Sequence, residues 1–356
     1  MNAVSASAVV ESAPHTDAQP QQMPPQAILA QMTMGFIVSQ AISVASRLYI
    51  ADHLKDGAKT IVELAELTQT HEPSLYRLMR GLTSIGIFQR DGAGNYSNTP
   101  LSDVLRDDHP ESFRAVSHMI CDHEHWRAHG NMLQSVKTGE MAFEYTFGQP
   151  IFPYFAQNPE PAKVFDNAMT SFTTTIAKAV AATYDFSEAQ TIADIAGGHG
   201  LLLSTVLNAN PQAKGILFEQ PQVLEGAGEV LEKSRTADRV ETVAGDFFSA
   251  IPVEADVYLM KFIIHDWNDE QSLTILRNLA KSAKPGAKVL LVETVVEEDD
   301  SIPSMSKMMD LNMLVMTGGK ERTEKEYAAL LEQSGFKLTR VIQTPSPMQI
   351  VEAVRV

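Results

Sequence analysis

The residues of this chain best suited to hold a ligand surround a glycine-rich turn. Gly197, Gly198 and Gly200 follow the β-prone run 191–196, and the apolar segment 201–207 predicts a helix directly after them. A turn without side chains lets backbone N–H groups and the positive end of a helix approach a ligand closely. A short glycine pattern also occurs in turns that bind nothing. The argument for a binding site therefore depends on the residues that follow.

Polar residues stand where the later strands of the same half of the chain end. In a parallel sheet, ligands bind outside the carboxyl ends of the strands. The residues that share this position are Asp194 in the first strand, Glu219 after the second, Gly245, Asp246, Phe247 and Phe248 after the third, Lys261, His265, Asp266 and Trp267 after the fourth, and Glu293 after the fifth. Glu219 lies about twenty residues beyond the glycines, where an acid can hold two ribose hydroxyls. Asp246 beside Phe247 suits the amino group and the ring face of adenine, so the set predicts a cofactor that carries adenosine.

The spacing of the glycines distinguishes two cofactors of this kind. The dinucleotide pattern G-x-G-x-x-G needs a third glycine, and Leu203 stands at that position after Gly198-His199-Gly200. A cofactor without a pyrophosphate, S-adenosylmethionine (SAM), therefore fits this loop better than NAD does.

The elements that must position these residues alternate between strand and helix. Strands are predicted at 191–196, 215–218, 240–243, 257–262 and 288–292, and helices at 201–209, 223–234 and 269–283. This alternation predicts an α/β fold with a Rossmann-like, mostly parallel sheet. Two closing strands, 336–343 and 348–355, are separated by Pro345-Ser346-Pro347 and predict an antiparallel C-terminal hairpin at the sheet edge.

The first third of the chain predicts a smaller, mainly helical domain. Thr60 and Glu63 form a capping-box pattern, Pro73 begins a second helix, and residues 87–97 are typical of a β-hairpin. Helix, helix and hairpin in this order make a winged helix. The densely apolar stretch 27–54 is expected to bury against another chain or another domain.

These patterns predict four parts of the chain. They are a disordered tail at 1–25, a winged-helix domain at 26–115, a helical linker that contributes to a substrate pocket at 116–180, and a cofactor-binding catalytic domain at 181–356.

Charge and composition argue against several classes of partner. A winged helix often binds DNA, but residues 28–115 hold 8 Lys and Arg against 10 Asp and Glu, and the whole chain has a net charge of −16. We therefore expect no nucleic-acid partner. No uninterrupted run of about eighteen apolar residues occurs, so no membrane span is expected. A single cysteine, Cys121, permits no internal disulfide and favours a reducing, cytoplasmic location.

A cluster of histidines in the helical stretch 114–172 raises the question of a metal site. His118 and His123 precede His125 and His129, which are four residues apart, a spacing that suits zinc. No cysteine pair and no HExxH pattern accompanies them, so a solvated or hydrogen-bonded helix face is favoured and no metal is predicted. One of the four histidines facing a substrate stays an open alternative.

The motifs together resemble one family, the plant-type small-molecule O-methyltransferases, which include caffeic acid, hydroxyindole (acetylserotonin) and bacterial polyketide enzymes. The resemblance runs from about Ile28 to the C-terminus. It is carried by Asp194-Ile-Ala-Gly-Gly-His-Gly200, Phe218-Glu-Gln-Pro221, Gly245-Asp-Phe-Phe248, Leu259-Met-Lys-Phe-Ile-Ile-His-Asp-Trp267 and Gly318-Gly-Lys-Glu-Arg-Thr323. It implies a SAM-dependent O-methyltransferase that forms a homodimer through an N-terminal winged-helix dimerisation domain.

The resemblance also implies roles for single residues. His265 corresponds to a catalytic base, Glu293 and Glu321 to the acids that flank its imidazole, and Asp266 lies beside it. A phenol with a pKa of about 10 is a poor nucleophile until a base takes its proton. The acceptor is expected to be a small aromatic or conjugated molecule, and no metal is required.

The substrate pocket is predicted from aromatic and methionine side chains around these motifs. The candidates are Trp126, Phe165, Met169, Trp267, Met309, Asn312, Met313 and Met316. Methionines spaced along a helix are as typical of a core as of a pocket that grips a flat molecule. That alternative stays open at this stage.

Two departures from the family pattern and two alternative functions remain. Ala196 stands where the family has a glycine and so adds one methyl group, and Glu219 is one methylene longer than the usual Asp. The alternatives are a relative whose activity is redirected to hydroxylation or decarboxylation, and a winged-helix regulator that senses SAM. The presence of His265 with both acids argues against the first, and the charge of the winged helix argues against the second.

Overall fold

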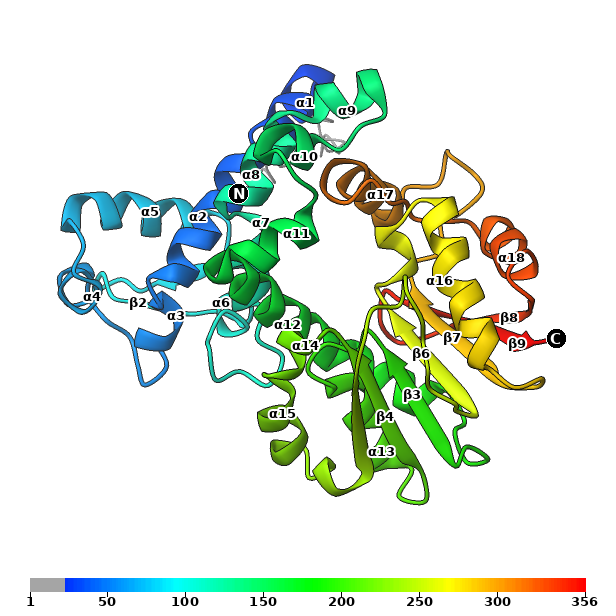
Figure 1. Cartoon of the computed structure of the whole chain (residues 1–356). Helices are drawn as coiled ribbons and strands as arrows, with labels where there is room; N and C mark the ends of the chain where they lie inside the picture. The colour runs from blue at the N-terminus through cyan, green and yellow to red at the C-terminus, as the bar shows by residue number, and fades with distance from the viewer. Residues whose placement is uncertain (1–22) are drawn as a thin grey trace, which may run out of the picture.

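The computed structural model describes residues 23–356. The predicted tail 1–25 therefore lies outside the described residues except for its last three, and Pro25 already begins a helix. Figure 1 shows a helical N-terminal part, a middle group of helices and a sheet flanked by helices, arranged around a central opening.

The N-terminal part has the predicted winged-helix arrangement. Its elements are α1 (Pro25–Thr33), α2 (Gly35–Arg47), α3 (Ile50–His53), α4 (Ile61–Thr68), α5 (Glu72–Ser84), β1 (Phe88–Arg90), β2 (Tyr96–Asn98) and α6 (Pro100–Asp103). The capping box is formed: the hydroxyl of Thr60 accepts from the N–H of Glu63, whose side chain accepts from the N–H of Thr60. β1 and β2 pair antiparallel as a hairpin. The core of this part includes Leu64, Met79 and Phe88.

Helices α1 and α2 leave many apolar side chains exposed, although Ala45 of α2 is buried in the core of this part. Met32 is 73% exposed and Leu29 65%, and no residue of α1 is buried. Within the stretch Pro25–Arg47, the most apolar window of 18 residues has a mean hydropathy of 1.6, so by length and composition alone the stretch could cross a membrane. Polar residues interrupt the stretch, and the apolar side chains still dominate its average. These exposed apolar side chains indicate that a surface outside the described residues covers them.

The middle of the chain is helical, as predicted for 114–172. It consists of α7 (Arg114–Ile120), α8 (His123–Gly130), α9 (Met132–Thr138), α10 (Ala142–Phe147), α11 (Ile151–Gln157) and α12 (Pro159–Thr183). The long helix α12 joins this group to the sheet, because Phe165 and Met169 near its start pack against α7, whereas Ile176 and Val180 near its end pack into the core of the sheet domain.

The C-terminal part confirms the predicted mostly parallel α/β sheet with an antiparallel hairpin at its edge. Its strands are β3 (Thr191–Ile195), β4 (Lys214–Glu219), β5 (Val240–Ala244), β6 (Val257–Lys261), β7 (Lys288–Glu293), β8 (Phe336–Gln343) and β9 (Gln349–Arg355). They are ordered β5-β4-β3-β6-β7-β9-β8, and only the pairs β7–β9 and β8–β9 are antiparallel. The helices are α13 (Leu201–Ala209), α14 (Pro221–Leu224), α15 (Ala227–Lys233), α16 (Asp269–Ser282), α17 (Met305–Met316) and α18 (Glu324–Glu332).

The parallel register places the predicted functional residues at one edge of the sheet. Asp194 in β3 pairs with Leu217 in β4 and with Leu259 in β6, so these strands end at the same level. Two apolar cores cover the two faces of the sheet and fix this arrangement. Asn268 caps α16 by accepting from the N–H of Gln271.

Two local expectations are wrong. The helix predicted at 223–234 is interrupted: α14 ends at Leu224, α15 begins at Ala227, and Gly226 between them leaves no room for a Cβ against the ring of His199. The first strand of the sheet ends at Ile195 and not at Ala196. Ala196 has a φ of 55°, in the left-handed region where a side chain is strained and glycine is preferred. The family's glycine at this position therefore has a conformational reason.

Candidate active site

The predicted ligand-binding residues surround one large cavity. It has a volume of about 1550 Å³ and lies at the carboxyl edge of the sheet, walled by α8, α11, α12 and α17. A volume well above the ~300–1000 Å³ of an ordinary ligand pocket has room for two molecules.

The glycine turn forms one end of the cavity. Gly197 and Gly198 line it, whereas Gly200 lies behind them as the residue that begins α13. A Cβ on Gly197 would come within 2.5 Å of the carboxyl carbon of Asp194, so only glycine fits there. Asp194 is buried under the turn, and within residues 23–356 neither of its carboxylate oxygens has a hydrogen-bond partner. Burial raises its pKa to about 7, against the opposing charge of Lys261.

Glu219 supports the turn from the end of β4. Its Oε2 accepts from the N–H of Gly198 at 2.9 Å, and its Oε1 accepts from the N–H of Gln220 at 2.7 Å. Burial raises the pKa of Glu219, although these two backbone hydrogen bonds lower it. Glu219 lines the cavity and can hold a pair of hydroxyl groups there.

The loop after β5 contributes rings to the cavity, and its acid stays outside. Phe247 and Phe248 line the cavity and meet Trp267, whose ring lies edge-on to that of Phe248 at 4.7 Å. The exposed Asp246 uses its carboxylate within its own loop, accepting from the N–H of Phe248 at 2.9 Å and from the hydroxyl of Ser249 at 3.1 Å. Gly245 also does not line the cavity, and it packs on the ring of Phe218.

Lys261, at the end of β6, is a half-buried cation that lines the cavity beside the glycine turn. Burial lowers its pKa to about 8, although Asp194 and Glu293 raise it. Its Nζ lies 4.3 Å from the ring centroid of Phe262, and that ring stacks on the imidazole of His265 at 5.2 Å and 10°. Phe262 belongs to the motif found in the sequence, but the stacking was not predicted, because it depends on a left-handed φ of 57° at this residue.

His265 is held by three carboxylates. Its Nδ1 lies 2.9 Å from Oε1 of Glu321 and 3.6 Å from Oε2 of Glu293. Its Nε2 lies 3.7 Å from Oδ1 of Asp266. Because a carboxylate only accepts, Nδ1 donates to Glu321, and Nε2 is the nitrogen left for chemistry. His265, Asp266 and Glu321 line the cavity, and Glu293 lies fully buried behind them.

The charges of this group set its protonation. Burial lowers the pKa of His265, but Glu293, Asp266 and Glu321 outweigh it and raise the value to about 10. Burial raises the pKa of Glu293 to about 7 and that of Asp266 to about 6. The imidazole is therefore stabilised as a cation, as a base must be once it has accepted a proton.

Oxygen and nitrogen atoms of His265, Glu293 and Glu321 lie within 4.8 Å of one another, close enough to be tested as metal ligands. Most of the carboxylate oxygens are already used. Oε1 of Glu293 accepts from the N–H groups of Ile263 at 3.0 Å and Ile264 at 2.9 Å, and Glu321 accepts from Nδ1 of His265 and from the hydroxyl of Thr294. This hydrogen bonding favours an imidazole held by acids over a metal centre.

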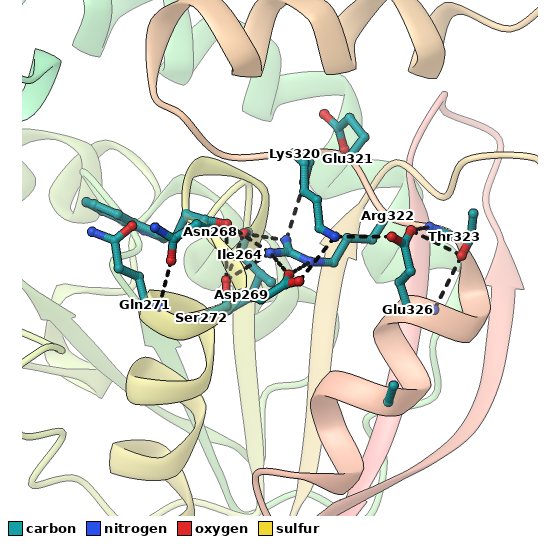
Figure 2. Close-up of polar contacts among 12 residues, drawn as sticks. Ile264, Asn268, Asp269, Gln271, Ser272, Lys320, Glu321, Arg322, Thr323 and Glu326 are labelled. Atoms are coloured by element: carbon teal, nitrogen blue, oxygen red, sulfur yellow. Dashed lines mark hydrogen bonds and ion pairs between the residues drawn. The ribbon is translucent and has the colours of Figure 1, made fainter. Parts of the chain in front are cut away.

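Arg322 ties the loop that carries Glu321 to the loop that carries His265 (Figure 2). Its guanidinium is fully buried and donates to the carbonyl groups of Ile264 and Trp267, both at 2.9 Å, and to Oδ1 of Asp269. The sequence contained this residue within its motif, but nothing in the sequence identified these partners.

All eight predicted pocket residues line the cavity. They are Trp126, Phe165, Met169, Trp267, Met309, Asn312, Met313 and Met316. Met313 and Met316 are also buried in the protein, so the same methionines serve both core and wall. Of the four clustered histidines, His125 and His129 line the cavity and His118 and His123 do not. Asp166 and His199, which also line it, were not predicted.

Comparison with known proteins identifies this arrangement. The family model of the O-methyltransferase domain matches residues 126–337, and that of the O-methyltransferase dimerisation domain matches residues 30–108. The chain belongs to the O-methyltransferase family. Its resemblance to that family, inferred from the motifs, is thereby confirmed, as is its assignment as a SAM-dependent O-methyltransferase.

Relatives of this O-methyltransferase are alike over nearly their whole length. Phenazine O-methyltransferase of Lysobacter antibioticus is 43% identical, over 93% of this chain and 96% of its own. The structure of human N-acetylserotonin methyltransferase, solved in complex with SAM, has a TM-score of 0.86 and 26% identity, covering 96% of this chain and 99% of its own. Aclacinomycin 10-hydroxylase of Streptomyces purpurascens is 32% identical, over 87% of this chain and 84% of its own.

SAM fits the residues present at the glycine end. The side-chain-free turn at Gly197 and the cavity-lining acid Glu219 form a cradle for a hydroxyl-bearing ligand, and the buried carboxyl group of Asp194 lies beneath that turn. The flat ring of Phe247 adds a face for a base. The family's cofactor and the geometry of this end therefore agree.

Proposed function

We propose that this enzyme methylates a hydroxyl group of a small aromatic or conjugated acceptor, with His265 as the general base. The observation that carries the proposal is the orientation of His265. Glu321 at 2.9 Å and Glu293 at 3.6 Å hold Nδ1, so that Nε2 is left for the acceptor in a cavity that the same imidazole lines. No metal takes part in this proposal.

The residues of the glycine end are proposed to hold the cofactor. Glu219 binds the ribose hydroxyls, Phe247 covers the adenine, and Lys261 with Asp194 balances charge beneath the glycine turn. Gly200, Gly245 and Asp246 shape the supporting loops. SAM supplies an electrophilic methyl carbon bonded to a sulfonium.

The proton balance follows from the site. The acceptor's O–H proton would pass to Nε2 of His265 as the acceptor oxygen takes the methyl group, and the carbon–sulfur bond that breaks would leave S-adenosylhomocysteine, a neutral thioether. The resulting imidazolium is stabilised by Glu321, Glu293 and Asp266, which raise the pKa of His265 to about 10 despite its burial. A phenol has a similar pKa of about 10, so the transfer is nearly balanced in free energy.

The proposal is tested by methyl transfer from labelled SAM to a panel of phenols, hydroxyindoles and hydroxyphenazines. His265→Gln is expected to lower kcat by about 10²–10⁴-fold, the usual contribution of a general base. Binding of S-adenosylhomocysteine should stay within threefold of the parent. Turnover near the parent rate in this variant would show that His265 is not the base, and the absence of transfer to every acceptor would favour the redirected activity.

We also propose a homodimer through residues 26–115 in the cytoplasm, without nucleic acid. The exposed apolar side chains of α1 and α2, among them Leu29, Met32 and Phe36, support a partner copy. Sedimentation equilibrium should give twice the chain mass, and Leu29→Glu with Met32→Glu should give monomers. Salt-sensitive binding of genomic DNA in a mobility-shift assay would instead favour a SAM-sensing regulator.

A further inference from the structure

Two histidines in the cavity wall have no role in the proposed methyl transfer. His125 and His129 lie one turn apart on α8, and both line the cavity. Their rings are nearly parallel, at 13°, with centroids 6.5 Å apart. Helix α8 packs against α17, which carries Met313 and Met316. Figure 1 shows both helices on the side of the opening away from α13, which begins at the glycine turn.

The hydrogen bonds of the two rings fix which nitrogen is free. Nδ1 of His125 lies 3.0 Å from Oδ1 of Asp122, and Nδ1 of His129 lies 2.9 Å from the backbone carbonyl of His125. Both partners can only accept, so each Nδ1 carries the proton. Each Nε2 is then the remaining nitrogen, and in a neutral ring it accepts a hydrogen bond. Among residues 23–356, no hydrogen bond reaches either Nε2.

The surroundings keep these acceptors in place. Asp122 is buried and also accepts from the N–H of His125 at 2.8 Å, so it fixes the orientation of that ring from the helix N-terminus. Burial lowers the pKa of His129, which keeps that ring neutral and its Nε2 unprotonated. The wall nearby is apolar, formed by side chains such as Trp126 and Phe155. Neither Nε2 is among the buried polar atoms that lack a partner in the described residues, so both stay accessible from the cavity, where a donor group of a ligand can reach them.

A metal is a poorer explanation for the pair. Two nitrogens do not complete a zinc site, which takes three or four protein ligands. In the described part of the chain, the group of three acids and histidines close enough to bind an ion is His265, Glu293 and Glu321, away from α8. A hydrogen-bond donor on the methyl acceptor matches both nitrogens without a further protein ligand.

We propose that His125 and His129 select methyl acceptors that carry a second hydrogen-bond donor, an O–H or N–H group, besides the hydroxyl that reacts. This inference rests on the proposed function, since it concerns the acceptor end of the same cavity. The two imidazoles then contact the acceptor directly and determine specificity, whereas His265 performs the proton transfer.

Binding to the parent enzyme saturated with S-adenosylhomocysteine tests the inference without turnover. Calorimetry would compare 2-naphthol with 1,6-, 1,7-, 2,6- and 2,7-dihydroxynaphthalene. At least one diol should bind about three- to tenfold more tightly than 2-naphthol, as one or two neutral hydrogen bonds allow. If no diol binds more tightly than 2-naphthol, the inference is wrong.

Variants of α8 then locate the selectivity. His129→Phe should reduce the ratio of diol to naphthol affinity to near one, and His129→Gln, which retains an acceptor oxygen, should keep much of it. His123→Phe is the matched control, because His123 lies on the same helix outside this cavity and packs on Phe147. An advantage that survives His125→Phe combined with His129→Phe would overturn the inference.

Labelled SAM in parallel reactions separates the two proposals. A diol preference in binding with no methylation of any acceptor means that the proposed function fails and the histidine selectivity stands. Methylation of naphthol and of the diols, with equal binding affinity for both, means that the proposed function stands and the histidine selectivity fails. S-adenosylhomocysteine affinity, measured for each variant, verifies that the site is folded.

Discussion

Gly319 lies directly against the backbone of His265. A Cβ on Gly319 would come 2.0 Å from the carbonyl oxygen of His265 and 2.4 Å from the carbonyl carbon of Asp266. The two motifs, more than fifty residues apart in the chain, thus meet through their backbones. The position of Glu321, two residues beyond Gly319, is thereby set relative to the imidazole that it holds.

Gly319→Ala should therefore displace the imidazole of His265 or its acid partner Glu321. The added methyl group needs about 1 Å more space, and neither backbone can provide it unless its loop moves. We expect kcat to fall by about 10²-fold, the typical effect of a 1 Å misplacement, with S-adenosylhomocysteine affinity within threefold of the parent. Gly228→Ala, at a position with no atom within 4 Å of the added methyl, is the control and should keep parent activity. Equal kcat in both variants would contradict the packing argument.

Arg322 should contribute more to stability than its half-buried neighbour Lys320. In Figure 2 both reach Asp269, but Arg322 is buried and also donates to the carbonyl groups of Ile264 and Trp267. Arg322→Met leaves those two carbonyls unpaired, so the free energy of unfolding should fall by about 2–5 kcal/mol. Lys320→Met removes surface ion pairs and should cost less than about 1 kcal/mol. Urea denaturation measures both; similar losses would contradict this account.

The sheet and the main site residues could be predicted from the sequence because both depend on local patterns. Alternating apolar segments set the strands, and parallel strands bring their carboxyl ends to one edge, so Glu219, Lys261 and His265 were placed in one site before the fold was known. Asp246 has an equally favourable position in the sequence, yet its carboxylate turns back to Phe248 and Ser249. The direction in which a side chain turns within its own loop produces no periodic pattern in the sequence, so it could not be predicted.

Other features depend on contacts that no local pattern contains. Arg322 finds Ile264 and Trp267 across more than fifty residues, and Phe262 stacks on His265 through an uncommon backbone conformation. The cavity wall combines helices α8, α12 and α17, and their packing decides which aromatic side chains face inward. The pKa of His265 likewise depends on three acids that meet only in the folded chain.

Ala196→Gly should stabilise the protein despite the loss of a methyl group. Ala196 has a φ of 55°, and a left-handed conformation costs a residue with a Cβ about 1–2 kcal/mol. Glycine relieves this strain but loses about 0.5–1 kcal/mol through greater freedom in the unfolded chain. We expect a net gain of about 0.5–1 kcal/mol in the free energy of unfolding, seen as a higher urea midpoint. Ala213→Gly, outside the left-handed region, should destabilise; a loss in Ala196→Gly would show that the strain is absent.

The pH dependence of kcat/KM should follow the imidazole of His265. Burial lowers its pKa, but Glu293, Asp266 and Glu321 raise the value to about 10, so the ring is mainly protonated at neutral pH and the basic form increases as pH rises. The profile reports groups of the free enzyme. For an unactivated phenol, kcat/KM should therefore rise by nearly tenfold per pH unit from pH 7 to 9 and level off near 10.

A nitrophenol, whose hydroxyl is already ionised over much of this range, removes the need for a base and provides the internal control. Its kcat/KM should rise far less with pH, and His265→Gln should slow its methylation much less than that of the phenol. A flat profile for the phenol would mean that the imidazole of the free enzyme is neutral at pH 7, and that the acids hold its orientation without raising its pKa. An equal loss for both acceptors in His265→Gln would mean that His265 positions the acceptor and takes no proton from it.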